Sequence, residues 1–223
     1  MPTAQAAAGS AGPAGPGGSG RARQARGESA RQALLAAAER VFSRAGYTGA
    51  TTAAIAVAAG LPKANLHYHF GSKEGLYREV LARTLRAWLV PLDGLRPEAD
   101  PRQALEAYIR AKMAMSAERP DASRVYANEL LHGAPVLGDL LKGELRAVVR
   151  GKAAVIDGWV AAGRMAPVDA TQLFFTIWAA TQTHADFDVQ VRAVLGRTRL
   201  TPRDHQRAAD HVVALLLRGC GLG

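Results

Sequence analysis

The sequence predicts an all-α protein of about nine helices. From Ser29 onward, apolar residues recur at the spacing of a helical face, and no alternating strand pattern of useful length interrupts them. Residues typical of helix starts and helix ends lie between the segments that show this pattern. The 223 residues suffice for one sizeable domain or two modest ones. The pattern favours two helical domains, residues 28–90 and 91–223, preceded by a tail.

The first 27 residues are expected to form a disordered basic tail. Residues 1–20 are almost wholly Ala, Gly, Pro, Ser and Thr, a composition that buries too little apolar surface to fold. Arg21, Arg23 and Arg26 follow without an acidic residue. Two interpretations remain open: a solvated tail, or a mobile arm whose arginines enter a DNA minor groove.

Four helices are expected in the first domain, each bounded by a capping residue or a helix breaker. Their expected ranges are Ser29 to Gly46, Thr52 to Gly60, Pro62 to Phe70 and Lys73 to Val90. Ser29 and Gln32 form a capping-box pattern, in which the two side chains satisfy each other's backbone amides. Thr51 or Thr52 is the expected cap of the second helix, and Ser72 that of the fourth.

Five further helices are expected in the second domain, and four of them begin at an N-cap pattern, two with a proline at the first helical position. Their expected ranges are 101–118, 121–132, 136–162, 170–188 and 202–219. The last helix carries more apolar surface than one helix of a monomer can bury, at Val212, Val213, Leu215, Leu216 and Leu217. The last two helices are therefore expected to pair across a two-fold homodimer.

Composition narrows the classes of function. No run of about 18 uncharged apolar residues is present, which excludes a membrane-spanning protein. Cys220 is the only cysteine, so an internal disulfide and a two-cysteine zinc site are excluded, and a reducing, cytoplasmic setting fits. The net charge of +9 and a pI near 10.3 indicate a polyanionic partner, either nucleic acid or an anionic membrane surface. Residues 28–90 hold eight Lys and Arg against four Asp and Glu, so the basic excess lies toward the N-terminus.

Residues 51–70 have the spacing of a helix-turn-helix. A short capped helix is followed by a turn at residues 60–62 and a second short helix, which can lie in the major groove of duplex DNA. The side chains expected to face phosphates or base edges are Lys63, Asn65, His67 and His69. Leu66 and Phe70 lie four residues apart and are expected to anchor this helix in the domain core.

Further positions around this motif have fixed spacings. They are Gly46-Tyr47, Thr51-Thr52, Ile55-Ala56, Ala59-Gly60, Tyr68, Phe70, Ser72-Lys73-Glu74 and Leu76. Together they resemble the DNA-binding domain of the TetR family of bacterial repressors. The resemblance implies that Thr51 or Thr52 caps its helix beside a phosphate and that Lys73 contacts the DNA backbone. It also brings Ala64 and Tyr68 into the DNA interface.

A second set of positions lies between residues 120 and 187. It includes Pro120, Ala122-Ser123-Arg124, Glu129-Leu130-Leu131, Gly158-Trp159-Val160, Ile177-Trp178-Ala179 and Ala185-Asp186-Phe187. These positions resemble the ligand-binding half of TetR-family regulators of pyrimidine utilisation, whose effectors are uracil and thymine. In such a site Trp178 would stack on the ring, and the Gln182 amide can pair with alternating N–H and carbonyl groups.

Side chains of the expected helices 170–188 and 121–132 form the expected effector site. They are Phe174, Trp178, Thr181, Gln182 and Asp186, with Tyr126 and Glu129 from a preceding helix. The alternative interpretation is a core stripe, in which Gln182 bonds inside the protein.

Enzyme and metal motifs are missing from the sequence. It has no Gly-x-Ser-x-Gly elbow, phosphate loop or His-Glu-x-x-His signature, and no cofactor is expected. His184, Asp186 and Asp188 are spaced by two on a helix, so their side chains diverge and no metal site is expected.

The sequence therefore predicts a DNA-binding regulator that binds a palindromic operator in double-stranded DNA as a dimer and is switched by a small effector. The alternative is a constitutive DNA-binding or architectural protein.

Overall fold

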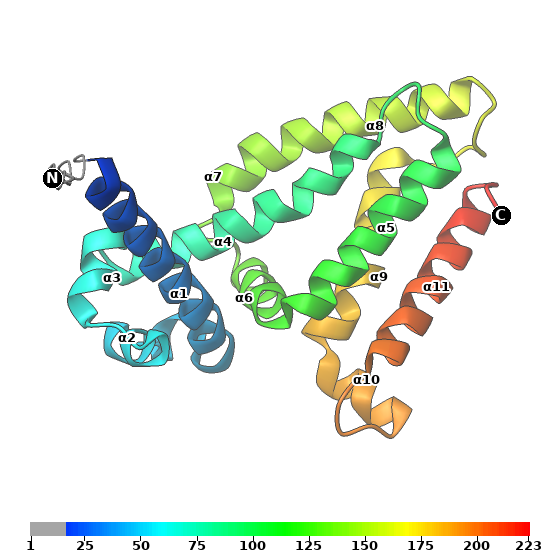
Figure 1. Ribbon diagram of the computed structural model, residues 1–223. Helices are drawn as coiled ribbons and strands as arrows, with labels where there is room; N and C mark the ends of the chain where they lie inside the picture. The colour runs from blue at the N-terminus through cyan, green and yellow to red at the C-terminus, as the bar shows by residue number, and fades with distance from the viewer. Residues whose placement is uncertain (1–16) are drawn as a thin grey trace, which may run out of the picture.

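The computed structural model describes residues 17–223, with side chains from Arg21 onward, and every regular element in this range is helical. The predicted all-α fold is confirmed. Figure 1 shows an N-terminal body of three helices, which α4 joins to a larger helical body. The first body contains α1 (Gly17–Gly49), α2 (Thr52–Ala59) and α3 (Lys63–Phe70), followed by α4 (Lys73–Leu89). The second contains η1 (Val90–Gly94), α5 (Pro101–Glu118), α6 (Pro120–Leu131), α7 (Gly138–Leu140), η2 (Leu141–Leu145), α8 (Arg146–Ala161), α9 (Ala170–Asp186), α10 (Asp188–Leu195) and α11 (Pro202–Gly219).

The start of α1 differs from the sequence prediction. Residues 17–27 are helical rather than part of a disordered tail, and residues 1–16 of that predicted tail lie outside the described range. Ser29 lies inside the helix, so the predicted capping box is wrong; the Gln32 amide donates instead to Glu28 Oε1 at 2.6 Å. Arginine, glutamine and alanine favour helix, which lets α1 extend through the expected cap.

Most of the other predicted caps are confirmed. Thr51 is the cap of α2, since its hydroxyl accepts from the Ala54 amide at 3.1 Å, and Ser72 caps α4 in the same way. Gly60 has φ 66° and ends α2 in the left-handed conformation that glycine adopts most easily. In the second body, helix starts are capped by Asp100, Asp169 and Thr201, the last in a capping box with Asp204.

Two segments of the second body depart from the predicted helices. The helix expected at 136–162 is present and runs without a gap from Gly138 to Ala161, but it includes a π-helical stretch, η2, between α7 and α8. The helix expected at 170–188 ends at Asp186, because Phe187 leaves helical geometry with φ −112° and ψ 31°. A further helix, α10, follows it and was not expected from the sequence.

Two packed clusters hold the molecule together. The first unites α1–α4 with α6, and its fully buried side chains include Leu34, Ile55 and Leu66. The second unites α5, α8, α9 and α11 around Trp159 and Phe174. Helix α6 of the second body contributes to the first cluster, where it packs against α1 and α4, and it also packs against α9, so it connects the two bodies. No helix within residues 17–223 is long and apolar enough to cross a bilayer.

Candidate DNA-binding surface and effector cavity

Helix α3 presents one continuous exposed face. Lys63, Ala64, His67 and Tyr68 are exposed, and at positions i, i+1, i+4 and i+5 they share one side of the helix. Tyr68 is the most prominent of them, with 85% of its surface exposed. Asn65 and His69, predicted to be exposed, are half-buried at the edges of this face.

The opposite side of α3 anchors the helix. Leu66 is fully buried, and Phe70 is half-buried with the Arg31 guanidinium 5.6 Å from its ring centroid. Both predicted anchors are therefore confirmed. Arg31 also pairs with Glu79 on α4, which ties α1 and α4 together beside α3.

The His67 ring is oriented by its own helix end. Its Nδ1 lies 3.0 Å from the carbonyl oxygen of Gly71. Because a carbonyl only accepts, Nδ1 carries the proton in this contact, and Nε2 remains available to a partner outside the helix. The Tyr68 ring packs edge-on against His69 with 4.9 Å between ring centroids, which holds the two rings together on this surface.

Lys73 has an intramolecular role that the sequence did not indicate. Its ammonium donates to the carbonyl oxygens of Tyr47 at 2.9 Å and Ala50 at 3.1 Å, and it lies 4.4 Å from the Tyr47 ring centroid. These contacts fasten the start of α4 to the turn between α1 and α2. An ammonium has three protons, so one remains for a phosphate.

A cavity of about 380 Å³ lies between α4, α5, α6, η2 and α9. Four of the predicted effector residues line it: Tyr126, Trp178, Gln182 and Asp186. Leu85, Trp88 and Leu89 line it from α4, so the helix that enters the DNA-binding body also forms a wall of the cavity.

Three predicted effector residues do not reach this cavity. Phe174 is fully buried in the second cluster. The Thr181 hydroxyl is also buried and donates to the carbonyl oxygen of Ile177, the turn before it. The Glu129 carboxylate accepts from the Tyr77 hydroxyl at 3.1 Å and from the backbone amides of residues 136 and 137. These two polar side chains therefore satisfy groups inside the protein, as polar groups on buried faces require.

Two further cavity residues, Tyr108 and Lys112, come from α5 and were not predicted. Lys112 is only 1% exposed, and its ammonium lies 3.7 Å from the ring centroid of Trp88. The sequence does carry a signal: Lys112 follows Leu105 by seven residues and Tyr108 by four, so it interrupts the apolar face of α5.

Burial changes the protonation of the cavity groups. It lowers the pKa of Lys112 to about 7, although the nearby Asp186 carboxylate acts in the opposite direction. Burial also raises the pKa of Asp186, while Ser123, the charges of Lys112 and Arg124, and the Gln182 side chain oppose the rise. The Tyr108 hydroxyl accepts from the Trp178 indole at 2.8 Å, and burial raises the pKa of Tyr108 to about 12. The cavity thus combines stacking rings with a weakly compensated cation and a carboxylate.

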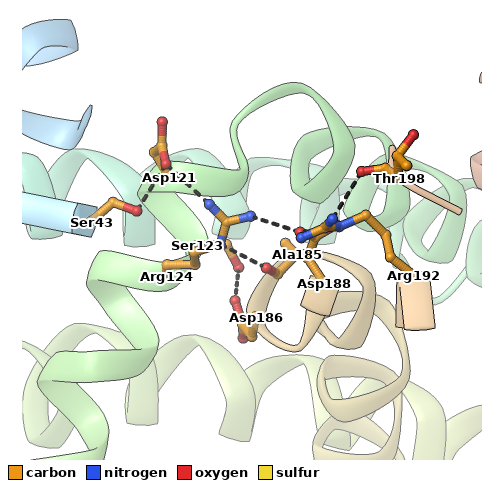
Figure 2. Close-up of polar contacts among 9 residues, drawn as sticks. All are labelled: Ser43, Asp121, Ser123, Arg124, Ala185, Asp186, Asp188, Arg192 and Thr198. Carbon is orange, nitrogen blue, oxygen red and sulfur yellow. Dashed lines mark hydrogen bonds and ion pairs between the residues drawn. The ribbon is translucent and has the colours of Figure 1, made fainter. Parts of the chain in front are cut away.

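Figure 2 shows a chain of polar contacts that runs from the cavity toward α1. Asp186 accepts from the Ser123 hydroxyl at 2.6 Å, and Asp121 accepts from the Ser43 hydroxyl at 2.8 Å. Between them, the Arg124 guanidinium pairs with Asp121 at 3.3 Å and donates to the carbonyl oxygen of residue 185 at 3.0 Å. We call Ser43, Asp121, Ser123, Arg124 and Asp186 the polar bridge. It connects α9, α6 and α1 by side-chain contacts.

The predicted reason for dimerisation is only partly right. Val212, Val213 and Leu217 are buried within the chain, because α11 packs against α5 and α9. Leu215 on α11 and Phe175 on α9 do remain exposed, at 61% and 48%. Exposed apolar side chains on these two helices keep them as the candidate dimer surface.

Comparison with known proteins assigns both halves of the chain. Residues 34–80 match the family of bacterial regulatory proteins called the tetR family, and residues 81–223 match the C-terminal region of YcdC-like proteins. The HTH-type transcriptional regulator RutR of Escherichia coli K12 is 42% identical over 189 residues, covering 85% of this chain and 89% of that protein. The HTH-type transcriptional repressor NicS of Pseudomonas putida is 34% identical over 106 residues, covering 47% of this chain and 50% of that protein.

Solved structures show the same fold. The TetR-family regulator PfmR from Thermus thermophilus superposes with a TM-score of 0.66 at 22% identity, covering 83% of this chain and 97% of that chain. A regulatory protein of the tetR family from Rhodococcus RHA1 gives a TM-score of 0.67 at 21% identity, covering 85% and 95%. This chain is therefore a transcriptional regulator and not an enzyme, and it belongs to the TetR family.

Proposed function

We propose that this regulator is a repressor that binds a palindromic operator as a homodimer and responds to a pyrimidine such as uracil or thymine. The observation that carries the proposal is the cavity, which Trp178 and Gln182 line together with residues of α4. A planar ring can stack on the indole while the glutamine amide pairs with its N–H and carbonyl edge. The resemblance of residues 120–187 to regulators of pyrimidine utilisation supports this assignment.

The DNA-binding residues follow from the exposed face of α3 and the N-terminus of α2. Lys63, His67 and Tyr68 would reach base edges and phosphates, with Asn65 and His69 at the margins. The Thr51 cap lies at a helix N-terminus, where a phosphate is favoured by the helix dipole. In a two-fold dimer the two α3 helices would lie about one DNA turn apart, roughly 34–36 Å. Such a protein would act in the cytoplasm.

Effector binding would reach the DNA through α4 and the polar bridge. Leu76 of α4 is buried in the DNA-binding body, while Trp88 of the same helix lines the cavity. The polar bridge adds a second connection, since Asp186 faces the cavity and Ser43 lies in α1. A tenfold change in operator affinity requires only about 1.4 kcal/mol of coupling, so the rearrangement of a few such contacts suffices.

Calorimetry with uracil, thymine, cytosine and a purine tests the effector. We expect uracil or thymine to bind below millimolar concentration and to weaken binding to a selected duplex. If none of the four binds, the pyrimidine assignment fails. If uracil binds without any change in DNA affinity, the chain is a DNA-binding protein that is not switched by it. A protein without an effector would gain no thermal stability in a screen of small metabolites.

A further inference from the structure

Lys112 places a cation at the wall of the effector cavity without a protein partner. Its side chain is 1% exposed, and in the part of the chain described with side chains, residues 21–223, its ammonium forms no ion pair within 4.0 Å and no hydrogen bond to a protein group. The Trp88 ring lies 3.7 Å from the ammonium, and the Asp186 carboxylate acts on it from beyond ion-pair distance. Among the described residues the fully enclosed side-chain atoms without a partner are Ser116 Oγ and His184 Nδ1, so the Lys112 ammonium is not sealed off but opens onto the cavity. An acceptor placed there would replace the hydration that the ammonium has largely lost.

The surroundings of Lys112 explain why no protein group accepts a hydrogen bond from its ammonium. From α4 and η2 the cavity receives only apolar side chains: Leu85, Trp88, Leu89, Leu141 and Leu145. The titratable groups around it are Asp186 on α9, Tyr126 on α6 and Tyr108 one turn earlier on α5. The Tyr108 hydroxyl is engaged by Trp178, and Asp186 is engaged by Ser123. The ammonium therefore lies beside a space that a ligand can fill.

We propose that Lys112 donates a hydrogen bond to an oxygen of the effector, so that the cavity selects planar rings that carry a carbonyl or carboxylate oxygen. This inference rests on the proposed function of the cavity as the effector site. On α9, Trp178 stacks on the ring and Gln182 pairs with its edge, while Lys112 on α5 donates a hydrogen bond to the oxygen. A ring of the same size without an oxygen leaves the ammonium uncompensated.

Binding is then linked to proton uptake near neutral pH. Burial lowers the pKa of Lys112 to about 7, so part of the free protein carries a neutral amine at pH 7–8. An oxygen acceptor favours the charged form and raises this pKa in the complex. Affinity is therefore highest below the pKa of the free protein and falls as pH rises above it, by at most about tenfold per pH unit for one proton. Tyr108 and Tyr126, with pKa values raised to about 12 by burial, stay neutral in this range.

A ligand panel with one substitution tests the selection of oxygen. Calorimetry compares uracil, thymine, benzoate and unsubstituted pyrimidine on the wild-type protein and on Lys112→Met, whose side chain is unbranched, uncharged and one atom shorter. We expect Lys112→Met to lose about tenfold or more in affinity for the oxygen-bearing rings, the effect of one hydrogen bond to a charged group. Lys142→Met is the matched control, because Lys142 is an exposed lysine outside the cavity lining.

Proton uptake supplies a readout that a purely structural lysine would not give. In two buffers of different ionisation enthalpy, wild-type binding should take up a fraction of a proton between about pH 7 and 8.5, and Lys112→Met should take up none. Asp186→Asn should move this window to lower pH, because the Asp186 charge holds the pKa of Lys112 up. If Asp186→Asn instead abolishes the uptake, Asp186 is the titrating group and the inference is overturned.

The panel separates this inference from the pyrimidine proposal. If benzoate binds, uracil and thymine do not, and Lys112→Met loses the affinity for benzoate, the pyrimidine proposal is rejected and the role of Lys112 is retained. Uracil binding that Lys112→Met leaves unchanged would retain pyrimidines and overturn the role of Lys112. Equal binding of unsubstituted pyrimidine and uracil would also overturn it, and binding of no member would overturn both.

Discussion

Replacing Lys73 by methionine removes the contacts of its ammonium with the segment between α1 and α2, and it tests the contact to DNA that the resemblance to TetR repressors implies. The ammonium donates to two carbonyl oxygens at 2.9 and 3.1 Å and lies 4.4 Å from the Tyr47 ring. Hydrogen bonds to a charged group contribute about 1.5–3 kcal/mol, and an exposed cation–π contact about 0.5–1 kcal/mol. Because Lys73 is half-buried, we expect a loss at the lower end, about 2 kcal/mol.

Thermal unfolding and DNA binding measure the two effects separately. For a chain of this size, about 2 kcal/mol corresponds to a decrease in Tm of about 4–8 °C. If the third ammonium proton contacts a phosphate, the slope of log affinity against log salt falls by about 0.9 for each bound protomer on a random-sequence duplex. A random duplex is suitable because phosphate contacts do not depend on sequence.

Lys63→Met is the matched control, because Lys63 is exposed on α3. It should change the stability by no more than about 0.5 kcal/mol and reduce the salt slope by a similar amount to Lys73→Met. An unchanged Tm in Lys73→Met would refute the intramolecular role worked out from the structure. A lower Tm with an unchanged salt slope would show that Lys73 positions α4 without touching DNA.

Four other substitutions test separate parts of the site. Gln182→Ala should lower uracil affinity in calorimetry by about tenfold, and unchanged binding would remove Gln182 from the effector contacts. Ser43→Ala removes the hydrogen bond by which the polar bridge reaches α1. Uracil should then weaken duplex binding less than in the wild type, by up to about tenfold, as measured by fluorescence anisotropy. If uracil weakens duplex binding as much as in the wild type, α4 alone transmits the signal. Leu215→Glu should convert a micromolar dimer to a monomer in sedimentation, whereas an intact dimer would place the interface elsewhere. Glu129→Gln should cost about 2 kcal/mol in chemical denaturation, because one amide oxygen cannot serve both backbone amides and the Tyr77 hydroxyl; an unchanged midpoint would contradict this internal role.

Local patterns were sufficient to predict most of the helices. The starts at Thr51, Ser72, Asp100, Asp169 and Thr201 were predictable because a cap depends on residues only three positions apart. The early start of α1 and the break at Phe187 were missed. Neither is marked by a strong breaker or cap, so packing and weak propensities decide them.

The α3 face was also largely predictable. Its eight residues form one short helix, so the periodicity that buries Leu66 places Lys63 and His67 on the opposite side. What the sequence did not indicate is that Lys73 reaches back to the turn after α1, since that contact joins residues 23 and 26 positions apart.

The sequence by itself determined the helical fold, the helix-turn-helix and the α9 stripe that contains Trp178 and Gln182. Only the tertiary structure decided which members of that stripe meet the cavity: Asp186 does, whereas Thr181 bonds within its own helix. It also revealed the role of Lys112. In the sequence this lysine only interrupts an apolar helical face, whereas in the structure residues of α4 and α9 surround it at the cavity. The physical reason is that caps and helical faces depend on neighbours along the chain, whereas a cavity and the charge it tolerates depend on helices brought together from distant parts of it.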